Sequence, residues 1–251
     1  MLTAQGVTDS AEGYLTTVPL VSDGVCDICH GAPNVGYRRC FSCAETYGQV
    51  ARPVPTVVPI SLYQIGGQLH HVLRGYKDNH DPGVRAQFSL LVAALLTRFL
   101  SRHGDCVARA AGATWEVATT VPSSRNRPLP HPLDRAIQLS PWLRDQCHPL
   151  LARGAGEVRH NQAGERAFMV TEDVRGRQLL LLDDTFTTGA ALQSAASALA
   201  VAGAQVVAAV VVGRVIDPGF STPAYELWSS AATIPFDFER CCLCSSGRDG
   251  Q

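Results

Sequence analysis

The chain has 251 residues, of which 46% are hydrophobic, and its formal net charge is −1 at pH 7. This length suits the core of one ordinary domain plus a small appendage, and two full-sized domains would hardly fit. With a pI near 6.7 the chain has no overall positive field, so extensive binding to nucleic-acid phosphates is not expected. A small phosphorylated ligand is compatible with this charge.

The first segment of the chain, residues 1–22, is expected to be mobile. Its first part is polar and lacks the basic segment of an export signal, and no apolar run in the chain reaches the length of a membrane span. We therefore expect a cytoplasmic protein without a membrane span. In that reducing compartment the nine cysteines favour metal ligation or free thiols over disulfides.

Two CxxC pairs with ten residues between them follow this segment, and their members are Cys26, Cys29, Cys40 and Cys43. Each pair can place two sulfurs on one metal, and the spacer, rich in turn-forming residues, lets the four thiolates meet tetrahedrally. A closed zinc site of this kind stabilises a module too small for its own core and leaves no open position for chemistry. We predict a structural zinc module over residues 23–50, with four free cysteines as the alternative.

The proline-punctuated stretch Arg52–Pro59 predicts an extended connection, and an α/β domain is expected over residues 60–240. Apolar periodicity predicts helices at 84–100, at about 133–152 with interruption by Pro141 and Pro149, and at 189–202. Strands are expected at 115–121, 167–170, 178–183 and 205–212. Strand, helix and strand in this order predict a Rossmann-like parallel sheet with a right-handed crossover. The Gly-rich, charged residues 153–166 indicate a long loop over an active site.

The strand Leu179–Leu182 ends in two acids and leads through a short polar turn into a helix. The turn consists of Thr185, Phe186, Thr187, Thr188, Gly189 and Ala190. Amide hydrogens of the helix N-terminus and the threonine hydroxyls suit one phosphate monoester, which Gly189 lets approach closely. Asp183 and Asp184 would hold ribose hydroxyls, directly or through hydrated Mg²⁺, and would stabilise positive charge developing on the ribose. The pattern therefore predicts a phosphoribosyl donor at the carboxyl edge of the sheet.

Two other kinds of site fit part of this segment. Four apolar residues before two acids also describe the magnesium-binding strand of P-loop nucleotide hydrolases, but the chain contains no GxxxxGK[ST] motif. A polar turn that merely caps a buried strand is the second alternative, although capping alone does not need Thr-Thr-Gly. The phosphate-loop interpretation accounts for more of the residues.

Residues 179–189 resemble the phosphoribosyl diphosphate motif of type I phosphoribosyltransferases, which is four apolar residues, two acids, two further residues and Thr-Thr-Gly. With the four-cysteine module, residues 26–213 resemble the ComF family of competence-associated phosphoribosyltransferase-like proteins, and Tyr63–Lys77 is similar to the family's joining region. The chain departs from the family at Ala190–Ala191, where a further threonine is usual. The resemblance implies a type I phosphoribosyltransferase fold and a diphosphate-binding loop containing Pro122, Ser123, Ser124 and Arg125.

The resemblance implies a phosphoribosyltransferase that binds phosphoribosyl diphosphate with Mg²⁺ and transfers the phosphoribosyl group to a nitrogen nucleophile. Asp183, Asp184 and Arg125 are the candidate catalytic residues. The alternative is a non-catalytic sensor of phosphoribosyl diphosphate or a nucleoside monophosphate. In that case the zinc module would contact a protein partner of the competence machinery, or single-stranded DNA in DNA uptake. Tyr37, Arg38, Arg39 and Phe41 form the basic and aromatic cluster of the module that such contacts would use.

A third CxxC pair, Cys241 and Cys244 with Cys242 between them, lies near the C-terminus without a fourth partner that spacing identifies. A cysteine-containing tail over residues 241–251 is expected, with a metal site shared with His30 or a neighbouring chain as the alternative. Cys106 and Cys147 are isolated in the sequence and are expected to be core thiols.

Overall fold

The structure is a computed structural model that describes residues 3–123, 127 and 129–244. It shows an α/β fold with four parallel strands in the order β1-β6-β5-β2. The strands are β1 (Val57–Tyr63), β2 (Val117–Thr120), β5 (Gln178–Phe186) and β6 (Gln205–Val215). A separate antiparallel hairpin pairs β3 (Leu151–Arg153) with β4 (Phe168–Val170). The prediction of an α/β fold with a parallel sheet is confirmed.

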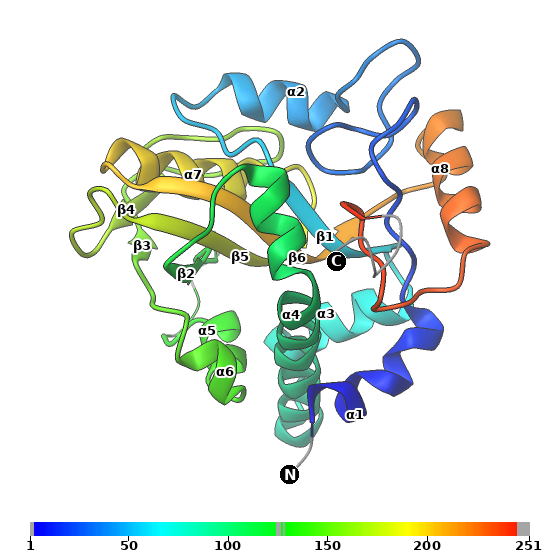
Figure 1. Ribbon diagram of the computed structural model, residues 1–251, viewed down its shortest axis with the longest axis horizontal. Helices are drawn as coiled ribbons and strands as arrows, with labels where there is room; N and C mark the ends of the chain where they lie inside the picture. The colour runs from blue at the N-terminus through cyan, green and yellow to red at the C-terminus, as the bar shows by residue number, and fades with distance from the viewer. Residues whose placement is uncertain (1–2, 124–126, 128, 245–251) are drawn as a thin grey trace.

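Both faces of the sheet are covered, so its central strands are apolar on both sides. Successive residues of β5 point to opposite faces: Leu180 and Leu182 join one apolar cluster, Leu179 and Leu181 the other. The first face carries α3 (Gln68–Asp78), α4 (Pro82–Ala111), α5 (Pro132–Ile137), α6 (Pro141–Arg144) and α8 (Thr222–Ala232). The second carries α2 (Phe41–Gly48) and α7 (Ala190–Val201), which lie above the sheet in Figure 1, while α3 and the first part of α4 lie below it.

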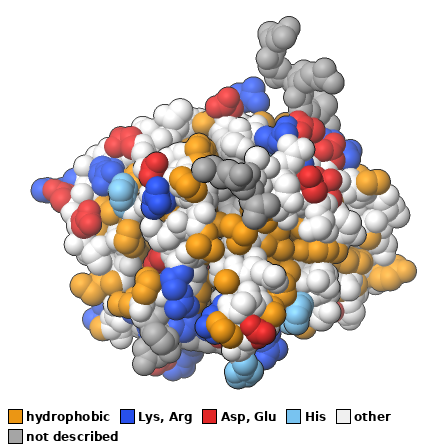
Figure 2. Space-filling model, turned by 90° about the horizontal axis from the view of Figure 1, so that it is seen from below, with side chains coloured by type: hydrophobic (Ala, Val, Ile, Leu, Met, Phe, Trp, Pro, Cys, Tyr) orange, Lys and Arg blue, Asp and Glu red, His pale blue; other side chains and the backbone are white. Residues whose placement is uncertain are grey.

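Helix α4 is the longest element of the described chain and begins and ends at recognisable caps. The Asp81 carboxylate accepts hydrogen bonds from Gly83 N and Val84 N at 2.7 and 3.3 Å, and Gly112 ends the helix with φ 70°. By length and composition α4 could cross a membrane, but Leu95 and Phe99 lie in the apolar core with much of its surface. It is therefore a core helix. Figure 2 shows the molecule from below the view of Figure 1, and on that side hydrophobic side chains form a band between charged groups.

The N-terminal residues described here pack on the core, in contrast to the mobile segment that the sequence suggests. Residues 4–14 form α1 (Ala4–Thr8) and the 3₁₀ helix η1 (Asp9–Tyr14). Ala11, Leu15 and Val18 are buried in the cluster that also contains α4. A bridge from Leu62 N to Thr16 O, 3.0 Å, extends the pairing at the β1 edge. The first segment of the chain is mostly polar, so its composition did not indicate that these three apolar residues are buried.

Other differences from the sequence-based elements have local causes. The helical stretch expected over residues 133–152 is interrupted at Pro141 as predicted, into α5 and α6, but its last part is wrong, because Pro149 ends the helical region and residues 151–153 form the strand β3. The sheet starts at Val57, inside the expected connection. Pro59 is tolerated there because β6 is the one described strand that pairs with β1 in the sheet, so β1 lies at its edge.

Candidate functional site

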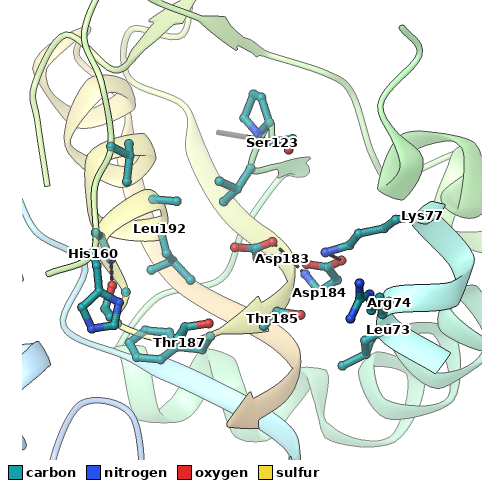
Figure 3. Close-up of a pocket in the computed structure, with 18 of the residues that line it drawn as sticks. Leu73, Arg74, Lys77, Ser123, His160, Asp183, Asp184, Thr185, Thr187 and Leu192 are labelled. Atoms are coloured by element: carbon teal, nitrogen blue, oxygen red, sulfur yellow. Dashed lines mark hydrogen bonds and ion pairs between the residues drawn. The ribbon is translucent and has the colours of Figure 1, made fainter. Parts of the chain in front are cut away.

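A cleft of about 680 Å³ lies at the carboxyl edge of the sheet, where β5 ends. Its walls come from the end of β5, the turn into α7, helix α3, the segment after β2, and residues 158–160. Figure 3 shows Asp183 and Asp184 in its middle, Lys77 reaching across from α3, and Thr187 and His160 on the opposite side. The strand, the turn and the acids singled out from the sequence therefore meet at one open site.

The β5–α7 turn, residues 185–190, is held in one shape by Gly189. This residue is the N-cap of α7 and has a φ of 80°, in the left-handed region that glycine adopts without strain. A Cβ on Gly189 would lie 2.5 Å from the Phe186 ring, so close packing also requires glycine. The Thr188 hydroxyl accepts a hydrogen bond from Ala190 N at 3.3 Å. The first residues of the 12-residue α7 thus face the cleft at the positive end of the helix dipole.

Behind the turn lies Arg214, a buried arginine near the end of β6. Its Nη1 donates to Thr187 O at 2.8 Å and to Phe186 O at 3.3 Å, while its Nε lies 3.3 Å from Cys29 Sγ. The guanidinium packs so closely on Gly31 that a Cβ there would lie 2.8 Å from Nη2. One buried cation therefore joins the β5–α7 turn to the N-terminal cysteines.

The four N-terminal cysteines form one compact cluster. The Sγ atoms of Cys26, Cys29, Cys40 and Cys43 all lie within 4.8 Å of one another. The Sγ atoms of Cys29 and Cys40 are 3.7 Å apart, close to the edge of about 3.8 Å expected for a tetrahedron with Zn–S bonds of about 2.3 Å. All four are buried, and Cys40 caps the helix α2 that carries Cys43. The predicted four-cysteine grouping is confirmed, and its donor set and spacing fit zinc.

The cysteine cluster packs on the sheet and on the turn. Its sulfurs belong to the same apolar cluster as Leu179, Leu181 and α7. The hydroxyl of Thr46 in α2 donates to Ser42 O at 2.8 Å and also lies 3.4 Å from Thr188 O. The four-cysteine module therefore contacts the backbone of the β5–α7 turn from the side opposite the cleft.

The two acids at the end of β5 have different surroundings. Asp184 is buried and accepts a hydrogen bond from the Tyr76 hydroxyl, and Lys77 Nζ pairs with the same carboxylate oxygen. Burial alone would raise the pKa of Asp184, but the charge and hydrogen bonds of Lys77 and Tyr76 bring it below its usual range. The pKa of half-buried Asp183 is raised well above 3.8 by burial and then by the charge of Asp184. Asp183 accepts one hydrogen bond, from Asp184 N at 2.8 Å, and this bond and the charge of Lys77 offset burial only in part, so Asp183 is the less compensated of the two acids.

Several basic and ring side chains complete the cleft. Arg127 lines it and pairs with Asp78, with Nη2 at 2.9 Å from Oδ2. Arg74 lines it from α3. His131 has no hydrogen-bond partner for either ring nitrogen among the described residues, and burial lowers its pKa, so the ring is neutral near pH 7. Burial also raises the pKa of Tyr63 to about 12, which keeps this residue a neutral donor. The cleft offers cations for an anion and a neutral imidazole beside them.

The loop over residues 153–166 is held at both ends, and its first part continues the β3–β4 hairpin: Gly154 N donates to Ala167 O at 2.8 Å and Gly156 N to Arg166 O at 2.7 Å. Gln49 donates through Nε2 to Asn161 O at 3.1 Å and accepts from Ala163 N at 2.7 Å. Gly164 N donates to Ser194 Oγ on α7 at 2.9 Å. By contrast, Arg159 and His160 are exposed at the cleft, and the guanidinium of Arg159 pairs with Glu157 of the same loop at 2.8 Å. Residues 157–160 therefore form the part of the loop that borders the cleft between two held segments, 154–156 and 161–165.

The structure brings most of the sequence-predicted residues together. Residues 183–190, Pro122 and Ser123 line the cleft. Ser124 and Arg125 lie outside the described residues. Sequence reasoning missed Arg74, Arg127, His131 and Arg214 as parts of this region. Only Arg214 had a clear signal: one arginine after a run of apolar strand residues must be buried, and a buried charge needs partners.

Comparison with known protein families gives no match, and comparison with curated proteins gives none either. The chemistry of the cleft therefore rests on its own residues.

Replacing Arg214 with methionine tests the link between the cysteine cluster and the turn. Arg214→Met is expected to lower the free energy of unfolding by about 2–4 kcal/mol, because two turn carbonyls and the thiolates lose a buried cation. Urea unfolding measures this. Arg177→Met is the control, since Arg177 only approaches Glu116 at 4.0 Å on the surface and should change stability by less than about 0.5 kcal/mol. Equal midpoints for the two variants would contradict the link.

The two acids should respond oppositely to loss of charge. Because the folded pKa of Asp183 lies above its ordinary value, ionisation of Asp183 disfavours the folded state, and this cost appears as the pH rises from about 3.8 through the folded pKa. Asp183→Asn should therefore raise Tm by about 2–4 °C at pH 8, with a smaller gain at pH 5.5. Asp184→Asn should lower Tm by about 4–8 °C, because Lys77 and Tyr76 lose their partner.

Thermal unfolding in magnesium-free buffer, with wild type and both variants side by side, makes the comparison. Since all three proteins carry the same cysteines, the effect of pH on metal binding cancels in the differences. A lower Tm for Asp183→Asn than for wild type at pH 8 would show that the charge of Asp183 is compensated after all.

Proposed function

We propose that the cleft binds phosphoribosyl diphosphate with Mg²⁺, and that the protein is a phosphoribosyltransferase-like protein of the ComF type with a type I phosphoribosyltransferase fold. The observation that carries the proposal is that the β5–α7 turn and Asp183, the less compensated of the two acids, line the same cleft at the carboxyl edge of a parallel sheet. The turn suits a phosphate and the acid suits a ribose. Both groups occur together in a phosphoribosyl donor.

The 5-phosphate would bind in the β5–α7 turn. The threonine hydroxyls and the amide hydrogens at the start of α7 are donors, and the helix dipole favours an anion there. Thr187 is exposed to the cleft, whereas the Thr188 hydroxyl also braces Ala190 N. Arg214 holds two turn carbonyls from behind, which keeps them from facing the anion.

The ribose would lie over Asp183. A carboxylate here accepts hydrogen bonds from ribose hydroxyls, which lowers the cost of its buried charge. The donor set also fits Mg²⁺, because this ion prefers carboxylate oxygens and keeps several waters. Asp183 is the residue that would hold the ion, through water or ribose oxygens. When bound, Mg²⁺ supplies charge neutralisation to the diphosphate.

The diphosphate would extend toward α3 and the segment after β2. Arg74, Lys77 and Arg127 line this side, together with Pro122 and Ser123. Arg125, the arginine proposed from the sequence, lies outside the described residues, while Arg127 belongs to the same segment. Guanidinium groups suit phosphate oxygens because they can pair bidentately.

In the proposed reaction the C1–O bond breaks and its electron pair leaves with diphosphate. The lone pair of a nitrogen nucleophile forms the new C1–N bond, and the nitrogen then loses a proton. Asp183 stabilises the positive charge that develops on the ribose, and the cations stabilise the leaving group. His131, neutral and unpartnered among the described residues, is placed to accept the proton. Closure of residues 157–160 would exclude water.

A non-catalytic sensor remains the second candidate because of the surface of the zinc module. Tyr37 and Phe41 are 71% and 60% exposed, and the side chain of Arg38 is 87% exposed. Exposed rings beside arginines suit a protein partner or single-stranded DNA in DNA uptake. In that case ligand in the cleft would regulate the contact. A cytoplasmic location accords with either role, since free thiolates ready for zinc require reducing conditions.

Calorimetry with phosphoribosyl diphosphate and Mg²⁺ tests binding. Wild type is expected to bind, and Asp183→Asn should weaken binding at least tenfold, equivalent to about 1.4 kcal/mol, with a larger loss when Asp184→Asn is added. Asp173→Asn is the matched control, because Asp173 is an exposed acid paired with Arg175. Equal affinities for wild type and the double variant would refute the ribose role of the acids.

Release of diphosphate separates the two candidates. The zinc-loaded protein is mixed with phosphoribosyl diphosphate, Mg²⁺ and a panel of purine, pyrimidine and amine acceptors. Acceptor-dependent release supports the transferase. Binding without release by any acceptor supports the sensor.

A further inference from the structure

A second group of potential metal ligands lies on the other face of the sheet, remote in sequence from the four-cysteine module. It brings together His103 and Cys106 of α4 with Cys241 and Cys244 near the C-terminus. The Nδ1 atom of His103 and the three Sγ atoms all lie within 4.8 Å of one another. We propose that these four residues bind a structural zinc ion. This site is independent of the function proposed for the cleft.

The distances suit a tetrahedral ion. Cys106 Sγ lies 3.7 Å from His103 Nδ1, Cys244 Sγ lies 3.8 Å from the same nitrogen, and the Sγ atoms of Cys241 and Cys244 are 3.3 Å apart. Tetrahedral edges of about 3.8 Å between two sulfurs and about 3.5 Å between sulfur and nitrogen follow from Zn–S bonds of about 2.3 Å and Zn–N bonds of about 2.0 Å, so each observed distance lies within about 0.5 Å of its ideal edge. Three thiolates and one imidazole are a set that structural zinc sites use.

The local structure presents each ligand in the required way. His103 and Cys106 are three residues apart on α4 and so share one side of the helix. Cys241 and Cys244 close a tight turn, in which Leu243 N lies 3.4 Å from Cys241 Sγ. A backbone amide that donates to a sulfur stabilises a thiolate. Cys242, between them, points away into the apolar core.

The imidazole of His103 is already oriented for a metal. Its Nε2 lies 2.8 Å from Phe238 O, an acceptor that fixes the proton on Nε2 and leaves the Nδ1 lone pair for the ion. His103 also packs on Phe99, with ring centroids 5.1 Å apart. An outer partner of this kind is typical of metal-binding histidines.

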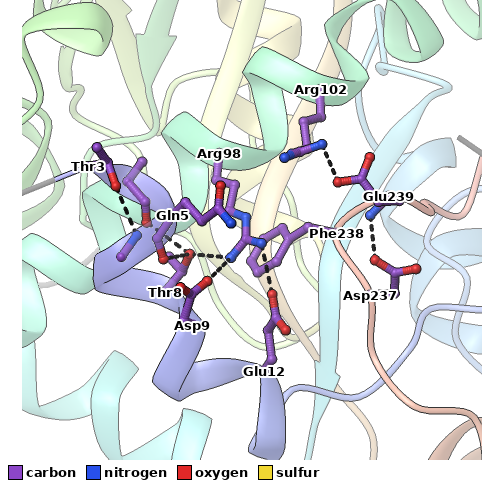
Figure 4. A network of polar contacts seen from close by, with 12 residues as sticks. Thr3, Gln5, Thr8, Asp9, Glu12, Arg98, Arg102, Asp237, Phe238 and Glu239 are labelled. Atoms are coloured by element: carbon purple, nitrogen blue, oxygen red, sulfur yellow. Dashed lines mark hydrogen bonds and ion pairs between the residues drawn. The ribbon is translucent and has the colours of Figure 1, made fainter.

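The site has a structural task at this place in the fold. Residues 236–244 form no helix or strand of their own and contact α4 through Phe238, which lies under the Arg98 guanidinium at 4.1 Å, and through Glu239, which pairs with Arg102 (Figure 4). Arg98 also pairs with Asp9 and Glu12 of η1 at 3.0 and 2.9 Å. An ion on His103 and Cys106 would fasten the C-terminal segment to the same helix that anchors the N-terminal one.

These contacts change two expectations from the sequence. Residues 241–244 are not an exposed tail, since Cys242 is 2% exposed and its neighbours are half-buried. Cys106 is a half-buried thiol facing this group rather than an isolated core thiol. The missing partners of the third CxxC pair lie on α4, well over 100 residues earlier in the chain, so spacing along the sequence could not identify them.

Zinc content of the intact protein tests the site. After purification under reducing conditions with zinc present, wild type should hold two zinc ions per chain. Cys106→Ala and Cys244→Ala should each hold one, and the ion retained in the four-cysteine module shows that the variant has folded. Cys147→Ala is the control, because this buried thiol belongs to neither cluster, and it should hold two.

X-ray absorption of the zinc edge gives a second measurement that needs no variant. The two sites together predict seven sulfur ligands and one nitrogen ligand for two ions. The proposal would be overturned if wild type and Cys106→Ala each held one zinc per chain and the absorption spectrum of wild type showed sulfur ligands only. A disulfide between Cys241 and Cys244 in protein kept under reducing conditions would overturn it as well.

Discussion

The contact between Arg214 and two carbonyls of the β5–α7 turn is the constraint on which the shape of the cleft depends. The arginine is buried, so its charge needs partners, and it finds them in the backbone of the turn and in the thiolate of Cys29. A zinc ion with four thiolates has a net negative charge, which a buried guanidinium compensates. The metal module thus stabilises a turn that it reaches only from behind, and the front of the turn stays open to a ligand.

Charge is distributed unevenly in the cleft, and the proposed function depends on this unevenness. Asp184 is already satisfied by Tyr76 and Lys77, whereas Asp183 carries a charge that burial and its neighbour both disfavour. Ligand hydroxyls or a cation would relieve that cost, so part of the binding energy is stored in the unliganded protein. The neighbouring arginines and the helix N-terminus favour an anion a short distance away. A sugar carrying phosphates meets both demands.

How far the sequence predicted this structure depends on whether the relevant signal was local. The strand Leu179–Leu182, the acids after it, Gly189 and the four-cysteine cluster follow from adjacent residues or short spacings, and the structure brings them together. The failures concern positions set by distant partners. Arg127 and His131 reach the cleft because of how the chain returns after β2, and Cys106 meets Cys244 because the C-terminal segment crosses α4. The helix expected over residues 133–152 is interrupted at Pro141 as its prolines indicate, but after Pro149 the chain forms the strand β3, whose partner β4 is distant in the sequence.

The central claim is that the β5–α7 turn holds the phosphate of a ribose phosphate. The most direct measurement is an NMR titration of the isotope-labelled protein with ribose 5-phosphate, following the backbone amides one by one. The account predicts that the amides of residues 185–190 shift first and saturate together, while the amides of α8 stay still. If the amides of the turn do not move while ligand shifts residues elsewhere, the claim is contradicted.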